Sequence, residues 1–171
     1  NDADNTLDGR HGHDTLSGGR GNDTYVGAAG DDILDGGLGI DTAGYTGASG
    51  QYAFINHQGI LRIADRVNAR DGVDQLINLE QIQFSGGIQA LNSVNSFIPL
   101  EYIASHSDLI NAFGSNAQAG YDHFIQHGRF EGRQVSFNAL EYIASYGDLA
   151  NVFGTNEDGG ATHFLQSGRF E

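Results

Sequence analysis

A nine-residue repeat runs without interruption from Gly9 and restricts the possible folds more than any other feature of this chain. Written in lines of nine, the sequence reads GRHGHDTLS, GGRGNDTYV, GAAGDDILD and GGLGIDTAG. Each line has glycine at positions one and four, aspartate at position six and a mostly apolar residue at position eight. The glycines and aspartates of this pattern are Gly9, Gly12, Asp14, Gly18, Gly21, Asp23, Gly27, Gly30, Asp32, Gly36, Gly39 and Asp41. A fixed period of this kind predicts a stacked repeat architecture and argues against a flexible Gly/Asp linker.

The spacing inside each repeat predicts its local structure. Six residues that include two or three glycines favour a turn, because glycine reaches unusual backbone angles at little cost. The other three residues form a short strand with one apolar side chain pointing inward. Two repeats then make one coil, and residues 18 apart stack at the usual strand spacing of about 4.8 Å. This places Asp14 beside Asp32, and Asp23 between Asn5 and Asp41, since Asn5 occupies the aspartate position of a partial earlier repeat.

The stacked aspartates predict a metal site. Two carboxylates at that distance repel each other by roughly 1 kcal/mol even at the dielectric constant of water. A cation between them removes this repulsion, and carboxylate oxygens with turn carbonyls form a hard ligand set that suits calcium. An EF-hand at Asp2, Asp4 and Asp8 is excluded because the glutamate at its twelfth position is missing. His11 and His13 occupy variable turn positions, where solvent exposure is expected.

These repeats resemble the repeats-in-toxin (RTX) proteins, whose consensus is G-G-x-G-x-D-x-(apolar)-x. The resemblance implies a right-handed parallel β-roll, calcium ions in the turns between stacked repeats, and export by a type I secretion system of Gram-negative bacteria. We expect about three ions in the roll, with strong sites at Asp14/Asp32 and Asp23/Asp41. A weaker site is expected at Asn5/Asp23, because Asn5 lacks the charge. Arg10 and Ala28 replace glycine at position two and are expected to distort their turns.

Residues 45–91 are predicted to form a β-rich cap on the roll of residues 1–44. Strands on either side of a His57-Gln58-Gly59 turn indicate a β-hairpin, and a repeat array needs a cap to cover its open end. The segment DGVDQLINLEQIQF resembles the flank that commonly follows RTX repeats. Asp71 and Asp74, together with Asp65, are candidates for one more calcium site, and an exposed acidic turn is the alternative.

Residues 92–171 contain a second, longer repeat. A shift of 40 residues aligns 96–131 with 136–171, with 22 of 36 positions identical. Apolar residues at helical spacing and glycines at 114 and 154 predict a short helix pair in each copy, with the two pairs stacked. Similar L-E-Y-I-A-S repeats accompany calcium-binding repeats in secreted bacterial proteins, without a defined activity. His123 and His127 are four residues apart, a spacing that allows a metal pair on one helix face. The second copy keeps His163 but has Ser167 in place of His127, so packing is favoured over the metal pair.

The composition excludes several functional classes. The chain has 22 acidic and 8 basic residues, with a net charge of −14, which argues against binding to nucleic acid. It has no cysteine and no lysine, so disulfides, thiolate metal sites and a Walker lysine are absent. No apolar stretch approaches the roughly 20 residues that span a bilayer. No catalytic constellation can be assembled, so we expect no enzymatic activity.

The sequence therefore predicts a fold of β plus α class: a calcium-filled parallel β-roll with a β cap, followed by two stacked helix pairs. We expect a non-catalytic calcium-binding module of a larger secreted or cell-surface protein, which folds on extracellular calcium. The absence of methionine predicts a fragment or a processed product. Two alternatives stay open: a calcium-dependent surface-layer or adhesin segment, and the tail of a secreted hydrolase, protease or polysaccharide-modifying enzyme. Expected partners are calcium and the type I secretion machinery, with self-association or cell-surface polysaccharide as alternatives.

Overall fold

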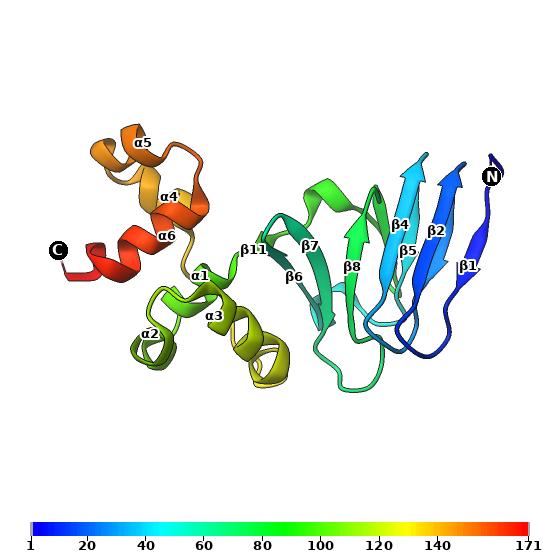
Figure 1. Ribbon diagram of the computed structural model, residues 1–171, viewed down its shortest axis with the longest axis horizontal. Helices are drawn as coiled ribbons and strands as arrows, with labels where there is room; N and C mark the ends of the chain where they lie inside the picture. The colour runs from blue at the N-terminus through cyan, green and yellow to red at the C-terminus, as the bar shows by residue number, and fades with distance from the viewer. Residues whose placement is uncertain (1, 171) are drawn as a thin grey trace. The chain divides into compact units, whose positions relative to one another are not determined.

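The protein, described here by a computed structural model for residues 2–170, divides into two compact units, Asn1–Ser96 and Phe97–Glu171. The first unit contains the strands, the last of which ends at Phe97, and the second unit contains the α-helices (Figure 1). The predicted order of a β region followed by a helical region is therefore confirmed. The predicted roll of residues 1–44 and the predicted cap of residues 45–91 both lie in the first unit.

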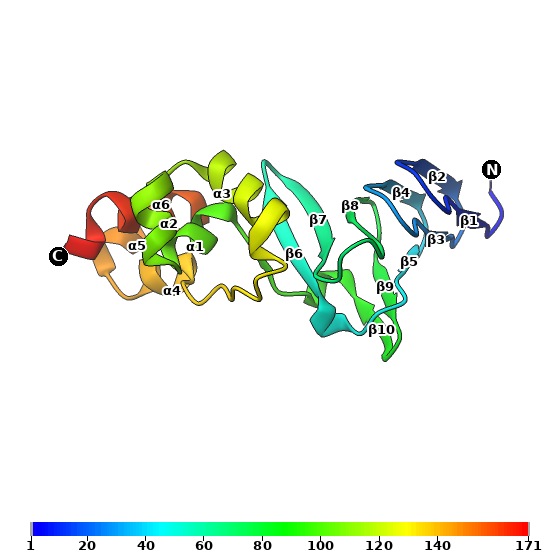
Figure 2. The same ribbon diagram turned by 90° about the horizontal axis from the view of Figure 1, so that it is seen from below.

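Two sheets form the first unit, and successive nine-residue repeats contribute to them alternately. The strands are β1 (Thr6–Asp8), β2 (Thr15–Arg20), β3 (Thr24–Val26), β4 (Ile33–Leu38), β5 (Thr42–Gly44), β6 (Tyr52–His57), β7 (Ile60–Asp65), β8 (Val73–Ile77), β9 (Gln81–Phe84), β10 (Gly87–Ala90) and β11 (Ser96–Phe97). One sheet has the order β1-β3-β5-β9-β10, and the other has the order β11-β6-β7-β8-β4-β2. Figure 2 shows β2 and β4 in one layer and β3 and β5 in the other.

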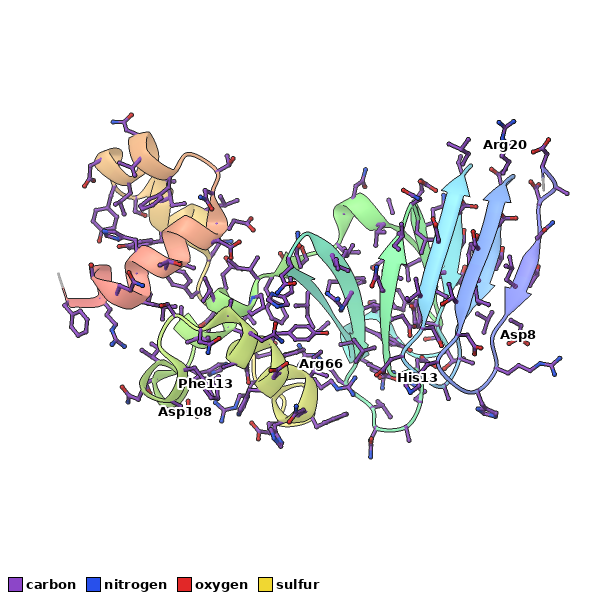
Figure 3. All side chains as sticks on the ribbon, in the orientation of Figure 1. Asp8, His13, Arg20, Arg66, Asp108 and Phe113 are labelled. Atoms are coloured by element: carbon purple, nitrogen blue, oxygen red, sulfur yellow. The ribbon has the colours of Figure 1, made fainter. Side chains whose placement is uncertain are left out.

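The strand register confirms the predicted stacking of residues 18 apart. Leu7 pairs with Tyr25 and Tyr25 pairs with Ala43, all in parallel strands of the first sheet. In the second sheet, Leu16 pairs with Leu34, again in parallel. The apolar side chains at position eight therefore form two columns, one in each sheet. The turns of alternate repeats lie at opposite ends of the strands, and Figure 3 shows Arg20 at the end opposite to His13 and Asp8.

The cap continues the roll and does not simply cover its end. Strand β8 lies parallel to β4, with Leu76 opposite Leu34, and β9 lies parallel to β5, with Ile82 opposite Ala43. The predicted hairpin is present as the antiparallel pair β6 and β7, and β7 pairs antiparallel with β8. Residues 73–84 thus add one further coil to the repeats, with β8 in one sheet and β9 in the other, and the hairpin β6–β7 extends the sheet that contains β8.

The core of the first unit lies between the two sheets and is largest near the cap. It consists of Tyr25, Leu34, Ala43, Tyr45, Tyr52, Phe54, Ile63, Leu76, Leu79, Ile82 and Phe84. Leu7 and Leu16, in the first coil, are only partly buried against this cluster. The repeats far from the cap therefore bury little apolar surface, and burial of apolar surface is the main favourable term in folding.

The second unit has three helices in each copy of the long repeat, where the sequence predicts two. The helices are α1 (Pro99–Ala104), α2 (Ser107–Phe113), α3 (Ala117–His123), α4 (Ala139–Ala144), α5 (Gly147–Phe153) and α6 (Glu157–Gln166). A π-helical turn, η3 (Phe124–Gly128), continues α3. The first two helices of each copy are separated because His106 and Tyr146 are extended, with φ of −137° and −130°. Neither residue is glycine or proline, so the sequence gives no strong signal for this break.

A hydrogen bond between a tyrosine and a histidine occurs at equivalent positions in the two copies. The Tyr102 hydroxyl lies 2.9 Å from Nδ1 of His123, and the Tyr142 hydroxyl lies 2.8 Å from Nδ1 of His163. Both bonds join the first helix of a copy to its third helix. The buried apolar side chains of this unit include Ile103, Leu109, Phe124, Ile143, Leu149 and Leu165.

Candidate metal centre

The aspartates at position six form two ladders of hydrogen bonds along the stacked turns. In each ladder, the backbone N–H of one residue donates to a carboxylate oxygen of the residue one coil closer to the cap. One ladder joins Asp14 to Asp32 (2.8 Å) and Asp32 to Asp74 (3.0 Å). The other joins Asn5 to Asp23 (2.8 Å), Asp23 to Asp41 (2.7 Å) and Asp41 to Glu80 (2.8 Å). The ladders therefore place the carboxylates of successive coils next to each other, as the 18-residue stacking predicts.

The second carboxylate oxygen of each of the four repeat aspartates is buried and, within the described residues, has no hydrogen-bond partner. These atoms are Oδ2 of Asp14, Asp23, Asp32 and Asp41. Asp23 and Asp32 are 1% exposed and Asp41 is fully buried. A buried ionised oxygen without a partner is strongly destabilising, because it loses water and gains nothing in return. Its recurrence at the same atom of every repeat is the arrangement expected of a cation-binding position.

Glycine at position one makes room for this unpaired oxygen. A Cβ atom added at Gly9 would lie 2.8 Å from Oδ2 of Asp14, and one at Gly36 would lie 2.7 Å from Oδ2 of Asp41. Both distances are shorter than real Cβ contacts. The same overlap occurs at Gly18 and Gly27 with the aspartates of their own repeats. A side chain at position one would therefore have to displace the aspartate carboxylate of its own repeat.

Burial disfavours the charged form of these carboxylates. It raises the pKa of both Asp32 and Asp41, because low-dielectric surroundings penalise an ionised group. The neighbouring carboxylates Asp14 and Asp23, respectively, raise these pKa values further, while the ladder N–H groups act in the opposite direction. A bound cation would counteract this penalty, because it stabilises the ionised form of Asp32 and Asp41.

The donor set fits calcium. Within residues 2–170 no group of three or more His, Asp or Glu side chains converges on one point, so carboxylates alone do not complete a site. Turn carbonyls lie in the same stack: a Cβ at Gly30 would overlap the carbonyl oxygen of Gly12, and one at Gly39 would overlap that of Gly21. Calcium accepts six to eight oxygen ligands and uses backbone carbonyls as readily as carboxylates. Two aspartates with carbonyls of the glycine turns form such a set.

Comparison with known families agrees with this chemistry. The family model of the RTX calcium-binding nonapeptide repeat matches residues 1–25 and 26–43. Residues 1–43 consist of RTX repeats. Repeats of this family imply calcium binding and are typical of secreted bacterial proteins. Comparison with curated proteins gave no match.

The RTX turns tolerate the two replacements at position two. Arg10 and Ala28 adopt φ of 70° and 64°, close to the 97° and 92° of Gly19 and Gly37 in the other two repeats. The N–H of Ala29 also donates to the carbonyl of Arg10 at 3.0 Å, so stacked turns stay bonded. The predicted distortion is therefore not observed, and both residues instead adopt a left-handed conformation that a side chain disfavours.

Asn5 takes part in the backbone ladder in the same way as the RTX aspartates. Its side-chain Nδ2 donates to the carbonyl of Ala3 at 2.8 Å. His11 and His13, expected to be exposed, are exposed, and Nδ1 of His13 accepts the N–H of Asp31 at 2.9 Å. The weaker calcium site at Asn5 and Asp23 stays a prediction.

The three aspartates of the cap have protein partners. Both oxygens of Asp65 accept bonds from the Arg70 guanidinium, at 2.6 and 2.7 Å. Oδ2 of Asp71 accepts the Tyr52 hydroxyl. All three aspartates are buried, so the alternative of an exposed acidic turn is wrong. The calcium site predicted at Asp71 and Asp74 stays a prediction, in a region where Arg70 already supplies a positive charge.

Asp74 is the last residue of one ladder, and its second carboxylate oxygen accepts a hydrogen bond from the protein. Its Oδ2 accepts the Tyr45 hydroxyl at 2.8 Å, and burial raises the pKa of its carboxyl to about 8. Sequence reasoning missed Tyr45 and Arg70 as partners, and missed Asp74 and Glu80 as the ends of the ladders. The spacing Gly72-x-Asp74-x-Leu76 matches positions four, six and eight of the RTX repeat and could have revealed the extra coil.

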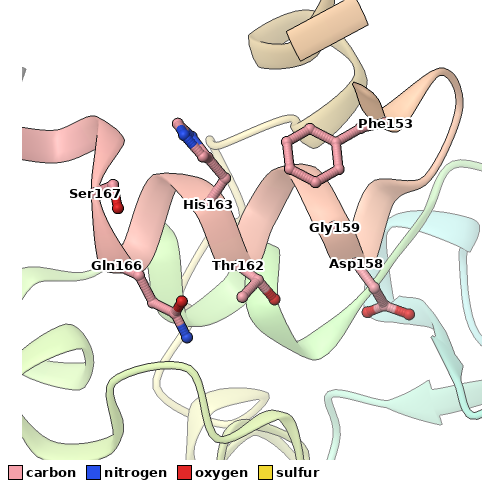
Figure 4. A pocket seen from close by; sticks show the side chains of 7 residues that line it. All are labelled: Phe153, Asp158, Gly159, Thr162, His163, Gln166 and Ser167. Atoms are coloured by element: carbon pink, nitrogen blue, oxygen red, sulfur yellow. The ribbon is translucent and has the colours of Figure 1, made fainter. Parts of the chain in front are cut away.

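The second unit has a cavity of about 350 Å³ in its second repeat (Figure 4). Its lining residues are Phe153, Asp158, Gly159, Thr162, His163, Gln166 and Ser167. His163 also packs against Phe153, with ring centroids 5.8 Å apart. In the first repeat, His123 has the same tyrosine contact as His163, and the ring of His127 lies 5.4 Å from that of His123. These contacts agree with the packing role expected for His123.

No helix in the described part of the chain is both long enough and apolar enough to cross a membrane.

Proposed function

We propose that residues 1–91 are a calcium-dependent folding module of a larger secreted protein, without catalytic activity of their own. The single observation that carries this proposal is the unpaired Oδ2 in all four RTX aspartates. The remaining carboxylate oxygens of the two ladders accept a backbone N–H or belong to the first or last residue of a ladder. One carboxylate oxygen per repeat is therefore left for a ligand. A hard divalent cation satisfies this atom and its neighbour in the stack at once.

Specific residues would hold the ions. Asp14 with Asp32, and Asp23 with Asp41, would each contribute carboxylates to one strong site, and Asn5 with Asp23 would contribute to a weaker one. The glycine turns that contain Gly12, Gly21, Gly30 and Gly39 would supply carbonyl oxygens. Calcium supplies the positive charge that permits these groups to be buried in the ionised form. About three ions in the roll follow from this assignment.

Binding and folding are coupled in this proposal. The outer coils bury little apolar surface and contain many glycines, whose ordering is entropically unfavourable. At a calcium concentration ten times the dissociation constant, each site contributes about 1.4 kcal/mol. Several sites therefore decide whether the roll folds. Low cytosolic calcium would keep the repeats unfolded for export, and millimolar calcium outside the cell would fold them.

A calcium titration followed by circular dichroism and calorimetry tests this proposal. We expect strand signal to appear with calcium, together with heat from about three sites, and little response to equal magnesium, which prefers rigid octahedral sites and retains its water. Asp32→Asn is the matched variant, because it keeps the size and the acceptor oxygen of Asp32 but removes the charge. Absence of calcium binding at millimolar concentration would refute the proposal. Calcium-driven self-assembly would instead favour the surface-layer alternative.

A further inference from the structure

The two helical repeats have similar sequences but differ in the exposure of one face. Leu100 in the first repeat is 4% exposed, and its counterpart Leu140 in the second is 38% exposed. Glu101 is 7% exposed, whereas Glu141 lies at the surface. The counterpart of the half-buried Ser105 is likewise exposed in the second repeat, at Ser145. We call Leu140, Glu141 and Ser145 the open face.

The start of the second repeat binds the corresponding face of the first. Oε1 of Glu101 accepts the N–H of Ala139 at 2.7 Å. Oγ of Ser105 accepts the N–H groups of Ser136 and Phe137, each at 2.9 Å. Three backbone donors of one short segment, residues 136–139, are therefore satisfied by two side chains of the preceding repeat. We call residues 136–139 the entry segment.

The open face presents the same acceptors in the same local geometry. Ser145 Oγ donates to the Glu141 carbonyl at 2.8 Å, as Ser105 Oγ donates to the Glu101 carbonyl at 2.7 Å. Within residues 2–170, no hydrogen bond from an N–H reaches the Glu141 carboxylate or the Ser145 hydroxyl oxygen. We propose that the open face is the docking surface for the entry segment of a further 40-residue repeat of the same type, joined in tandem.

The chemistry of the first repeat argues against a second copy of this chain as the occupant. The residue of the first repeat that corresponds to Ala139 is Pro99, which has no N–H to donate to Glu141. The N–H of Ile98, just before it, already contacts Oε2 of Glu101 at 3.3 Å. The entry segment of the second repeat is already bound to the first. A further repeat must therefore resemble residues 136–171, with an N–H at the position of Ala139.

The test extends the complete chain by one more copy of residues 132–171 and follows helix unfolding in saturating calcium. We expect the extended chain to unfold several degrees higher than the original, and the amides of the added entry segment to be protected from hydrogen exchange. Glu141→Gln should remove part of this gain in the extended chain, because hydrogen bonds to a charged acceptor are the stronger ones. The same substitution should leave the unfolding temperature of the original chain unchanged, since Glu141 is exposed there.

A matched control replaces, in the added copy only, the alanine that corresponds to Ala139 with proline. The native chain starts α1 with Pro99, so proline is compatible with this helix position and the added repeat can still fold. We expect this control to lose most of the added thermal stability. An unchanged melting temperature in the extended chain overturns the proposal. Concentration-dependent dimerisation of the original chain that Glu141→Lys abolishes also overturns it, because the occupant is then a second copy.

Discussion

The RTX repeats of the first unit and the helices of the second unit differ in how their buried carboxylates are hydrogen-bonded. In the first unit, Oδ2 of all four RTX aspartates is buried without a hydrogen-bond partner among the described residues. In the second unit, the buried carboxylate of Glu101 accepts an N–H at each oxygen, from Ala139 and from Ile98. A carboxylate with two N–H donors needs no cation, whereas a stack of carboxylates with one open oxygen each does. We therefore expect calcium to be a structural requirement of the first unit alone.

Calcium removal should give the largest effect and tests the comparison directly. With EDTA, we expect residues 1–44 to lose protection from hydrogen exchange and the strands of residues 45–91 to lose part of theirs. Helices of residues 97–171 should keep most of their protection, because their cores consist of Leu, Ile, Tyr and Phe side chains. Exchange measured along the chain by mass spectrometry checks this. Loss of protection in both units together would show that the chain unfolds as one cooperative unit.

Substitution of aspartates that have different numbers of ladder neighbours should give the next largest effect. Asp23→Ala should raise the calcium concentration at the folding midpoint more than Asp14→Ala, by about tenfold if one additional site is lost. Asp23 lies between Asn5 and Asp41 on its ladder, and Asp14 has a neighbour only on the side of Asp32. Asp23→Asn serves as control, because it keeps an acceptor for the Asn5 N–H. Equal midpoints for the two alanine variants would contradict the stacking of the sites.

The calcium-free first unit should become more stable as the pH falls. Burial raises the pKa of Asp74 from 3.8 to about 8, so the folded state binds more protons than the unfolded state between these values. The free energy of unfolding must then decrease as the pH rises from about 4 to about 8. Asp32 and Asp41 shift in the same direction. In EDTA, exchange protection of β4 and β8 should therefore be partly restored at pH 5.

Asp74→Asn isolates one contribution to this pH dependence. The amide keeps an acceptor for the Asp32 N–H and a polar group near the Tyr45 hydroxyl, but it cannot ionise. We expect it to stabilise the calcium-free unit at pH 8 by roughly 1–3 kcal/mol and to have little effect at pH 5. Stabilisation by the same amount at both pH values would show that the charge of Asp74 is not the cause.

A turn substitution should give the smallest effect. Ala28 has φ of 64°, in the left-handed region, so Ala28→Gly should stabilise the calcium-bound roll by about 1 kcal/mol. A calcium-saturated thermal scan measures this change. Ala29→Gly is the control: Ala29 is absent from the residues with positive φ, and glycine there should be neutral or destabilising. A stabilising Ala29→Gly would show that backbone strain at residue 28 is not the source of the gain.

Several features of the metal centre could be predicted because they depend on a short period. The nine-residue register places Asp14 on Asp32 and Asp23 on Asp41 whatever the rest of the chain does, since parallel stacking preserves the spacing. The sequence also indicated the hairpin and the helical character of residues 96–171. It did not indicate the break at His106, where an ordinary residue becomes extended between two short helices.

By itself, the sequence determined the repeating part of this protein, because each RTX unit contains its own turn, strand and carboxylate. Only the tertiary structure decided how the repetition ends. Glu80 completes one ladder from outside the nine-residue register, and Tyr45 closes the other by bonding to Asp74. In the helices, the identical residues Glu101 and Glu141 have different surroundings because only one of them has a repeat packed against it. Such differences depend on neighbours distant in the chain, so a local pattern cannot specify them.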